Sequence, residues 1–69
     1  GSLIYPNPAK QSFNYFSDKR ETLWIQSIDG KTISSKQIFK GINEINISQL
    51  KKGIYIIKVI DRIQKLIVN

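Results

Sequence analysis

The sequence contains no cysteine and no histidine in its 69 residues. This removes the thiolate nucleophile, the commonest general base and most zinc ligand sets, and it excludes disulfides without indicating a redox compartment. Gly30-Lys31 lacks the glycine pattern of a phosphate-binding loop. The sequence therefore predicts a protein that is not an enzyme and holds no cofactor or metal. Its few acidic residues fall in expected turns or at exposed strand positions: Asp18, Glu21, Asp29, Glu44 and Asp61.

Long apolar runs and sustained helical spacing are also missing. No stretch reaches the roughly 18 apolar residues of a membrane-spanning helix, so no transmembrane segment is expected. Short segments rich in Ile, Val, Tyr and Thr alternate instead with turn residues, which indicates about seven short strands. The fold class expected is all-β: a small antiparallel β-sandwich with immunoglobulin-like or Greek-key connections.

The length allows one domain with a thin core, because a chain of this size buries only about 60% of its unfolded surface. Gly1-Ser2 is typical of a cloning remnant, so we expect residues 1–2 to be foreign and residues 3–69 to form the domain. The segment is then a piece of a longer precursor.

The last quarter of the chain is expected to form a hairpin. Two apolar runs, Ile54–Ile60 and Ile63–Val68, flank Asp61-Arg62 as the expected turn. The first run is apolar on both faces, which is typical of a strand in the middle of a sheet. Alternation places Tyr55, Ile57 and Val59 on one face of this strand and Ile54, Ile56, Lys58 and Ile60 on the other.

Upstream segments show the same alternation. The expected strands are Ser12–Phe16, with Phe13 and Tyr15 on one face; Thr22–Ile28, with Leu23 and Ile25 on one face; Lys31–Lys40, exposed or bulged; and Asn43–Ser48, with Ile45 and Ile47 inward. Asp29-Gly30 predicts a two-residue hairpin turn, Gly41 a break, and Leu50 an apolar plug in the following loop. Trp24 faces away from Leu23 and Ile25, and it is either a packing residue of a second face or an exposed contact.

The segment Pro6-Asn7-Pro8-Ala9 cannot continue a strand ladder. Its two prolines fix φ and remove two backbone donors, so we expect a corner at which the chain passes between sheets. We interpret Tyr5 and Tyr55 as core aromatics. The three glycines Gly30, Gly41 and Gly53 are interpreted as positions where the backbone takes a conformation that other residues disfavour.

The net charge is +6, from eleven basic and five acidic residues. The basic residues are scattered over the whole chain, whereas nucleic-acid modules gather charge on one element among stacking aromatics. Lysines that keep a small β domain soluble and protect its edge strands explain the pattern better, so no nucleic-acid partner is expected.

Five short motifs occur together in the order and spacing of one family. They are Leu3-Ile4-Tyr5-Pro6-Asn7-Pro8-Ala9; Leu23 and Ile25 before Asp29-Gly30-Lys31; Ile45-Asn46-Ile47-Ser48-Gln49-Leu50; Gly53-Ile54-Tyr55-Ile56-Ile57-Lys58-Val59; and Lys65-Leu66-Ile67-Val68. They resemble the YPNPA opening, the strand with its GK turn, the IDLS-x-L segment, the G-x-Y-x-V-K-V strand and the Lys-plus-apolar tail of the type A C-terminal sorting domain. That domain is the sorting signal of the type IX secretion system of Bacteroidota. Departures such as Asn46 and Ser27, where the family commonly has Asp, fall at turns and exposed positions.

The resemblance implies an address label without activity of its own. The cargo would be the N-terminal part of the same precursor, which would cross the inner membrane on its own signal. The label would fold in the periplasm and meet the outer-membrane translocon and its shuttle proteins. A sortase-like protease would typically remove it, and the cargo would become extracellular or be anchored at the cell surface.

Recognition is expected at the tail, by analogy with the family. The final strand would leave a ladder edge and a carboxylate available to a partner, or for self-association of the isolated domain. The residues expected to carry recognition are Lys65, Leu66, Ile67, Val68 and Asn69. The apolar three could equally be a closing core strand and Lys65 a solvated lysine. The motif positions Tyr5, Pro6, Asn7, Pro8, Ala9, Gly30, Lys31, Gly53 and Tyr55 are expected to be structural or to join in recognition.

Two other functions remain open from the residues alone. In a carbohydrate-binding or adhesin-like sandwich, Trp24, Tyr15 and Phe16 would form a coplanar aromatic strip for a sugar. A basic nucleic-acid module would instead require a one-sided charge distribution.

Overall fold

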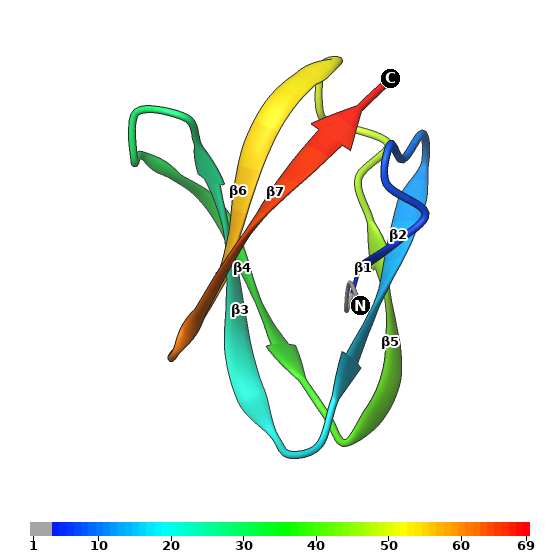
Figure 1. The fold of residues 1–69 in the computed structure, drawn as a ribbon, viewed down its shortest axis with the longest axis vertical. Helices are drawn as coiled ribbons and strands as arrows, with labels where there is room; N and C mark the ends of the chain where they lie inside the picture. The colour runs from blue at the N-terminus through cyan, green and yellow to red at the C-terminus, as the bar shows by residue number, and fades with distance from the viewer. Residues whose placement is uncertain (1–3) are drawn as a thin grey trace.

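The computed structural model describes residues 4–69, and two β-sheets make up the fold. The first sheet has the strand order β1-β2-β5 and the second has the order β4-β3-β6-β7 (Figure 1). Every pairing of strands within the sheets is antiparallel. The strands are β1 (Ile4–Tyr5), β2 (Ser12–Ser17), β3 (Glu21–Ser27), β4 (Thr32–Ile38), β5 (Gly41–Asn46), β6 (Gly53–Val59) and β7 (Arg62–Val68).

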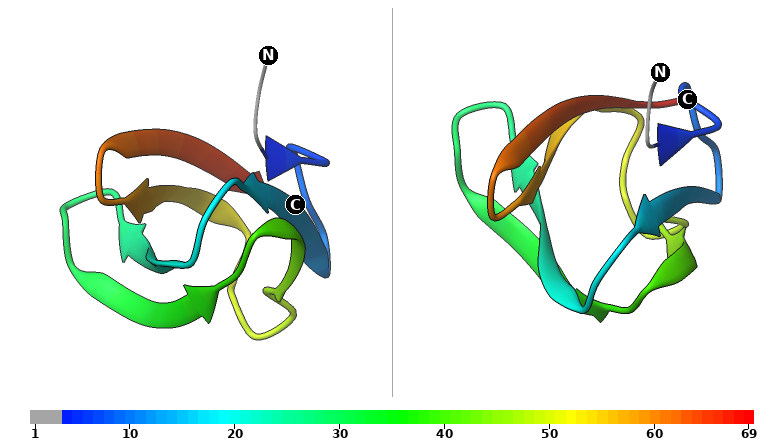
Figure 2. Two further views of the ribbon diagram at one scale, coloured as in Figure 1. Left: turned by 90° about the horizontal axis from the view of Figure 1, so that it is seen from below. Right: turned by 60° about the horizontal axis from the view of Figure 1, so that its bottom comes forward.

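The connections are those of an immunoglobulin-like sandwich. The pairs β3–β4 and β6–β7 are hairpins within the second sheet, whereas β2–β3, β4–β5 and β5–β6 pass from one sheet to the other. Figure 2 shows the two sheets curving around a common interior. The expected all-β sandwich of about seven short strands is confirmed. None of residues 4–69 belongs to a helix long and apolar enough to cross a membrane.

The core lies between the sheets because one face of most strands is apolar. Phe13, Leu23 and Leu66 are 0% exposed, and Ile57 is 2% exposed. The residues expected to share a face in β2, β3 and β6 do share one, and the structure turns this face toward the core. Ile45 and Ile47 point inward, as expected. β6 lies between β3 and β7, as expected of a strand apolar on both faces. The remaining buried apolar residues are Ile4, Ala9, Tyr15, Ile25, Ile38, Ile45, Ile47, Val59 and Val68.

The turn between β3 and β4 has three residues, so the expected two-residue turn was wrong. The Ser27 N–H donates to the Lys31 carbonyl oxygen, and Ile28, Asp29 and Gly30 lie between these two residues. Of these three turn residues, only Gly30 takes a positive φ, +93°. A two-residue turn of the favoured type needs positive φ at both central positions, whereas a three-residue loop needs it only at the last, which here is glycine. The Ser27 hydroxyl also donates to the Asp29 carboxylate, and this bond lowers the pKa of Asp29.

The turn of the final hairpin lies one residue earlier than expected. Val59 pairs with Arg62, so Ile60 and Asp61 form the turn and Arg62 begins β7. Ile60 is 75% exposed. Its apolar side chain made it resemble a strand residue, but the register of the hairpin places it outside the ladder.

The strand β4 is exposed and bulged, as expected. Ile25 pairs with Ser34 while Gln26 pairs with Thr32, so Ile33 is the extra residue in β4. Gly41 does not end a strand but begins β5, with a φ of +107° that favours glycine. The Asn43 side chain bonds both the N–H and the carbonyl oxygen of Phe39, which fixes the corner between β4 and β5.

Tyr5 is 47% exposed, so its expected place in the core was wrong. Ile4 pairs with Tyr15 and is buried, and strand alternation therefore directs Tyr5 outward. Tyr55 is half-buried against the core, and its hydroxyl donates to the Lys51 carbonyl oxygen at 2.6 Å. Leu50 packs on the core from its loop, as expected. The expected remnant Gly1-Ser2 lies outside the described residues.

Two matched substitutions in β6 test the assignment of its faces. Ile57→Val should lower the free energy of unfolding by about 1 kcal/mol, because it removes a methylene from a filled core. Ile54→Val makes the same chemical change at a side chain that is 45% exposed, and it should change stability by less than about 0.5 kcal/mol. Urea unfolding of both variants measures the difference. Equal losses would show that the core does not lie on the Ile57 face.

Candidate functional site

The first motif and the tail lie side by side, at the end of the molecule where the C-terminus meets the β1–β2 connection (Figure 1). Ala9 forms a parallel bridge with Val68. The Ala9 N–H donates to the Ile67 carbonyl oxygen, and the Asn69 N–H donates to the Ala9 carbonyl oxygen, both at 2.8 Å. The first and the last of the five motifs therefore form one continuous surface.

Asn7 extends this pairing with its side chain. Its Nδ2 donates to the Lys65 carbonyl oxygen, and its Oδ1 accepts from the Ile67 N–H, each at 2.9 Å. The amide thus replaces a strand residue and pairs with the outer edge of β7. We call Asn7, Ala9 and Lys65–Asn69, with these bonds, the terminal clamp.

The corner expected at Pro6–Ala9 is present. β1 belongs to the first sheet, while Ala9 pairs with β7 of the second. The peptide bonds before Pro6 and Pro8 are cis. Both prolines are exposed, and Ala9 is completely buried. The motif therefore joins the two sheets with one side and faces solvent with the other.

The five tail residues divide by face. Leu66 and Val68 point into the core and are 0% and 3% exposed. Lys65 and Asn69 are exposed, and Ile67 is half-buried on the outer face. β7 is an edge strand, as expected, but Asn7 and Ala9 already occupy its outer edge from Lys65 to Asn69. The surface at this end of the folded strand therefore consists of the side chains of Lys65, Ile67 and Asn69 and not of an open ladder.

The other motif residues have separate positions. Gly53 and Tyr55 pair with Val68 and Leu66 in the adjacent strand, so they support the tail from β6. Gly30 and Lys31 lie in the β3–β4 turn, and β4 is the opposite edge strand of this sheet from β7. The structure therefore brings Gly53 and Tyr55 to the terminal clamp and leaves Gly30 and Lys31 apart from it.

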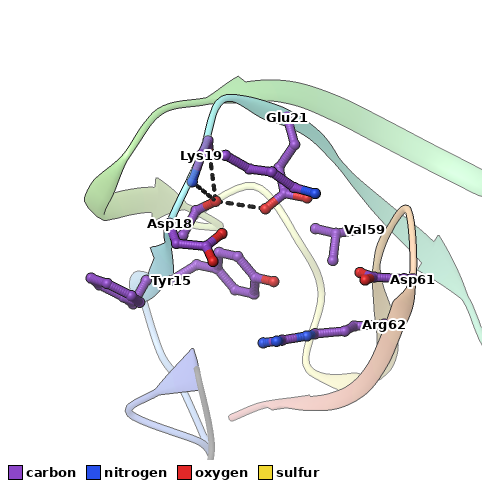
Figure 3. A pocket seen from close by; sticks show the side chains of 9 residues that line it. Tyr15, Asp18, Lys19, Glu21, Val59, Asp61 and Arg62 are labelled. Carbon is purple, nitrogen blue, oxygen red and sulfur yellow. Dashed lines mark hydrogen bonds between the residues drawn. The ribbon is translucent and has the colours of Figure 1, made fainter.

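A polar pocket of about 230 Å³ lies between the β2–β3 and β6–β7 turns. Figure 3 shows the Tyr15 ring at its centre, with Asp18 and Glu21 on one side and Arg62 on the other. The buried Ser17 hydroxyl lies 2.5 Å from Glu21 Oε2 and 2.6 Å from the Lys19 carbonyl oxygen, and it accepts from the Lys19 N–H at 3.3 Å. These bonds order the turn that forms the pocket wall.

The surroundings of the pocket shift the ionisation of the Tyr15 phenol. Burial and the nearby Glu21 carboxylate raise the pKa of Tyr15, and the Arg62 guanidinium opposes this only in part. The protonated phenol is therefore favoured over the phenolate in this pocket. Within residues 4–69, no group of three His, Cys, Asp or Glu residues could hold a metal ion.

Trp24, Tyr15 and Phe16 do not form the aromatic strip that a carbohydrate-binding module would require, so the structure does not support that alternative. Tyr15 is 4% exposed and faces the core. Phe16 is on the outer face of the first sheet, and Trp24 lies half-buried on the outer face of the second, beside Lys58. Strand alternation and the two separate sheets place the three rings on three different surfaces.

The strand order defines a small immunoglobulin-like β-sandwich domain, closed at one margin by the terminal clamp. The family of secretion system C-terminal sorting domains matches residues 3–69, and the chain belongs to this family. The domain is a sorting signal of the type IX secretion system, a class of label that is not an enzyme. It implies contact with that machinery and export toward the outer membrane or cell surface. No curated protein and no solved structure matched the chain.

Sequence reasoning found the residues of the terminal clamp but not their pairing. Asn7 and Lys65 are 58 positions apart, and no local pattern connects them. The available signal was the asparagine between two prolines, a polar side chain held at a fixed corner with both a donor and an acceptor.

Removing the Asn7 amide should loosen the clamp. Asn7→Ala should lower the free energy of unfolding by about 1 kcal/mol, since two solvent-exposed hydrogen bonds are lost. Amide exchange should accelerate at Ile67 and not at Ile57, which lies inside the sheet. Lys10→Ala, at an exposed neighbour, is the control. Unchanged exchange at Ile67 would contradict the role given to Asn7.

The Tyr15 pocket predicts a loss of stability at alkaline pH. The pKa of the phenol is raised above its ordinary value of 10.0 in the folded state. The stability that the protonated Tyr15 phenol contributes to the free energy of unfolding is therefore fully present below pH 10.0. It is lost as the pH rises through the folded-state pKa. Between about pH 9 and about pH 11, the wild type should lose more unfolding free energy than Tyr15→Phe. Tyr5→Phe controls for removing an exposed phenol and should follow the wild type.

Proposed function

We propose that the type IX machinery recognises this label through the outer surface of the terminal clamp. The observation that supports the proposal is the hydrogen bonding of Asn7 and Ala9 to Lys65–Asn69. This pairing makes one epitope from the first and last motifs of the domain. The epitope exists only after folding, because its two halves are far apart in the sequence.

The side chains suited to contact are Lys65, Ile67 and Asn69, together with the exposed prolines of the corner. Ile67 would supply apolar contact area for the centre of an interface, and Lys65 beside it a charged group for the polar rim. Leu66 and Val68 act indirectly. They fill the core and hold β7 in place, so their recognition role is to position the clamp.

The partners that would read this epitope are the outer-membrane translocon, its shuttle proteins and a sortase-like protease. The domain would fold in the periplasm, while attached to its N-terminal cargo. The label would be removed on export, and the cargo would be released or anchored at the surface. On this proposal the domain has no activity of its own.

A charge and polarity change on the clamp tests the proposal. Lys65→Glu/Ile67→Ser should reduce export of a periplasm-directed fluorescent reporter fused to residues 3–69 about tenfold or more, in a bacterium with type IX machinery. The reporter should accumulate in the periplasm. Truncation at Lys65 is a poorer test, because losing buried Leu66 and Val68 costs several kcal/mol of stability by itself.

The matched control is Lys40→Glu/Ile42→Ser, which changes the same residue types at the same spacing. Ile42 is 66% exposed on the other sheet, and Lys40 is exposed in the β4–β5 corner. This variant should be exported like the wild type. Both variants should have wild-type circular dichroism spectra and urea midpoints. Normal export of the Lys65/Ile67 variant would rule out the clamp as the recognition surface.

A further inference from the structure

The two sheets are joined along one margin and open along the other. At the β7 margin, Ala9 and Asn7 connect the sheets. At the opposite margin, β4 ends the second sheet and β5 ends the first, and each is paired on one side only. Figure 2 shows β4 and β5 as separate ribbons joined by the Phe39–Lys40 corner. In the described part of the chain, two free strand edges therefore face this open seam.

The side chains of β4 reflect the opening. Lys36 pairs with Leu23 and Ser34 pairs with Ile25, so both point to the core side of the sheet. Both are nevertheless exposed, because no strand of the other sheet covers them. Only Ile38, at the end of β4 next to the corner, is buried. The polar middle of this strand is thus explained by the seam in front of it.

A groove of about 460 Å³ occupies the seam. Ile25, Ile47 and Leu50 contribute apolar lining, and the bulged Ile33, 43% exposed, lies at its margin. Lys36 is the charged residue that lines it. From Lys31 to Asn43 the chain carries three lysines and no acidic residue.

We propose that this groove accepts an extended, acidic segment of a partner protein as an added strand on β4. Its backbone would pair with the free edge of Thr32–Ile38, a mode of binding that gives affinity through main-chain hydrogen bonds. A carboxylate of the segment pairs with Lys36. Apolar side chains two positions away on the same face contact Ile47 and Leu50.

The position of Lys36 favours some occupants of the groove over others. A lysine on the inward face of an edge strand disfavours an apolar strand, because its ammonium would be buried without a partner. A second copy of the chain, paired through β4, would bring another basic edge against it. A segment with a carboxylate at this position would instead form an ion pair with the Lys36 ammonium, so the lysine would favour this occupant. This surface is separate from the terminal clamp, so it does not depend on the role proposed for the tail.

Two short peptides test the proposal on the intact domain. Both alternate valine and threonine over nine residues and are capped at each end; one has glutamate at its centre and the other has lysine. Titration of isotope-labelled domain with each peptide is followed through backbone amide chemical shifts. We expect the glutamate peptide to shift the amides of Thr32–Ile38 and Leu50, and to bind about tenfold more tightly than the lysine peptide.

Charge exchange distinguishes a specific pair from general attraction to a basic protein. Lys36→Glu should reverse the preference, so that the lysine peptide binds more tightly. Lys58→Glu makes the same change on the outer face of β6 and should leave the preference for glutamate as in the wild type. Shifts confined to β7, equal binding of the two peptides, no binding of either, or an unreversed preference in Lys36→Glu would each overturn the proposal. Failure here would leave the export test of the clamp unaffected.

Discussion

The arrangement of this domain depends on one short stretch of backbone pairing. Ala9 is buried between the sheets, and its N–H and carbonyl oxygen bond Ile67 and Asn69. Buried backbone groups need such partners, since an unpaired one is costly in a core this small. The pairing holds the edge of the second sheet against the start of the first. The buried tail side chains and the exposed corner both follow from it.

The sandwich is consequently asymmetric. Its β7 margin is closed by main-chain and side-chain hydrogen bonds, and its β4 margin is left with polar side chains facing a groove. A small domain cannot enclose its core on every side, because its surface is large relative to its volume. In this chain the uncovered side carries Ser34 and Lys36, so solvent at the groove meets polar groups on β4 rather than an apolar strand.

Local chemistry allowed much of the fold to be predicted. Alternation grouped Phe13 with Tyr15, and Leu23 with Ile25, on shared faces, which the structure turns inward. Gly30 marked a turn that requires positive φ. The errors came from features that depend on register. Tyr5 was expected inside, and Ile60 was expected in a strand, because apolar character alone does not show which face or which pair a residue joins. The clamp and the open seam depend on contacts between distant segments, and a single sequence contains no direct signal for them.

The geometry of the clamp also determines how the domain would respond to mechanical force. Ala9 and Val68 run parallel, so a pull on the chain before Ala9 and an opposite pull on the chain after Val68 slide the two segments along each other. In this direction the four hydrogen bonds of the clamp are loaded together instead of being broken one after another. A load applied between Ala9 and Val68 is thus resisted by all four bonds before β7 is drawn away from the core. A pull directed across the β6–β7 hairpin would instead load its hydrogen bonds one at a time, so the domain resists traction differently along different directions.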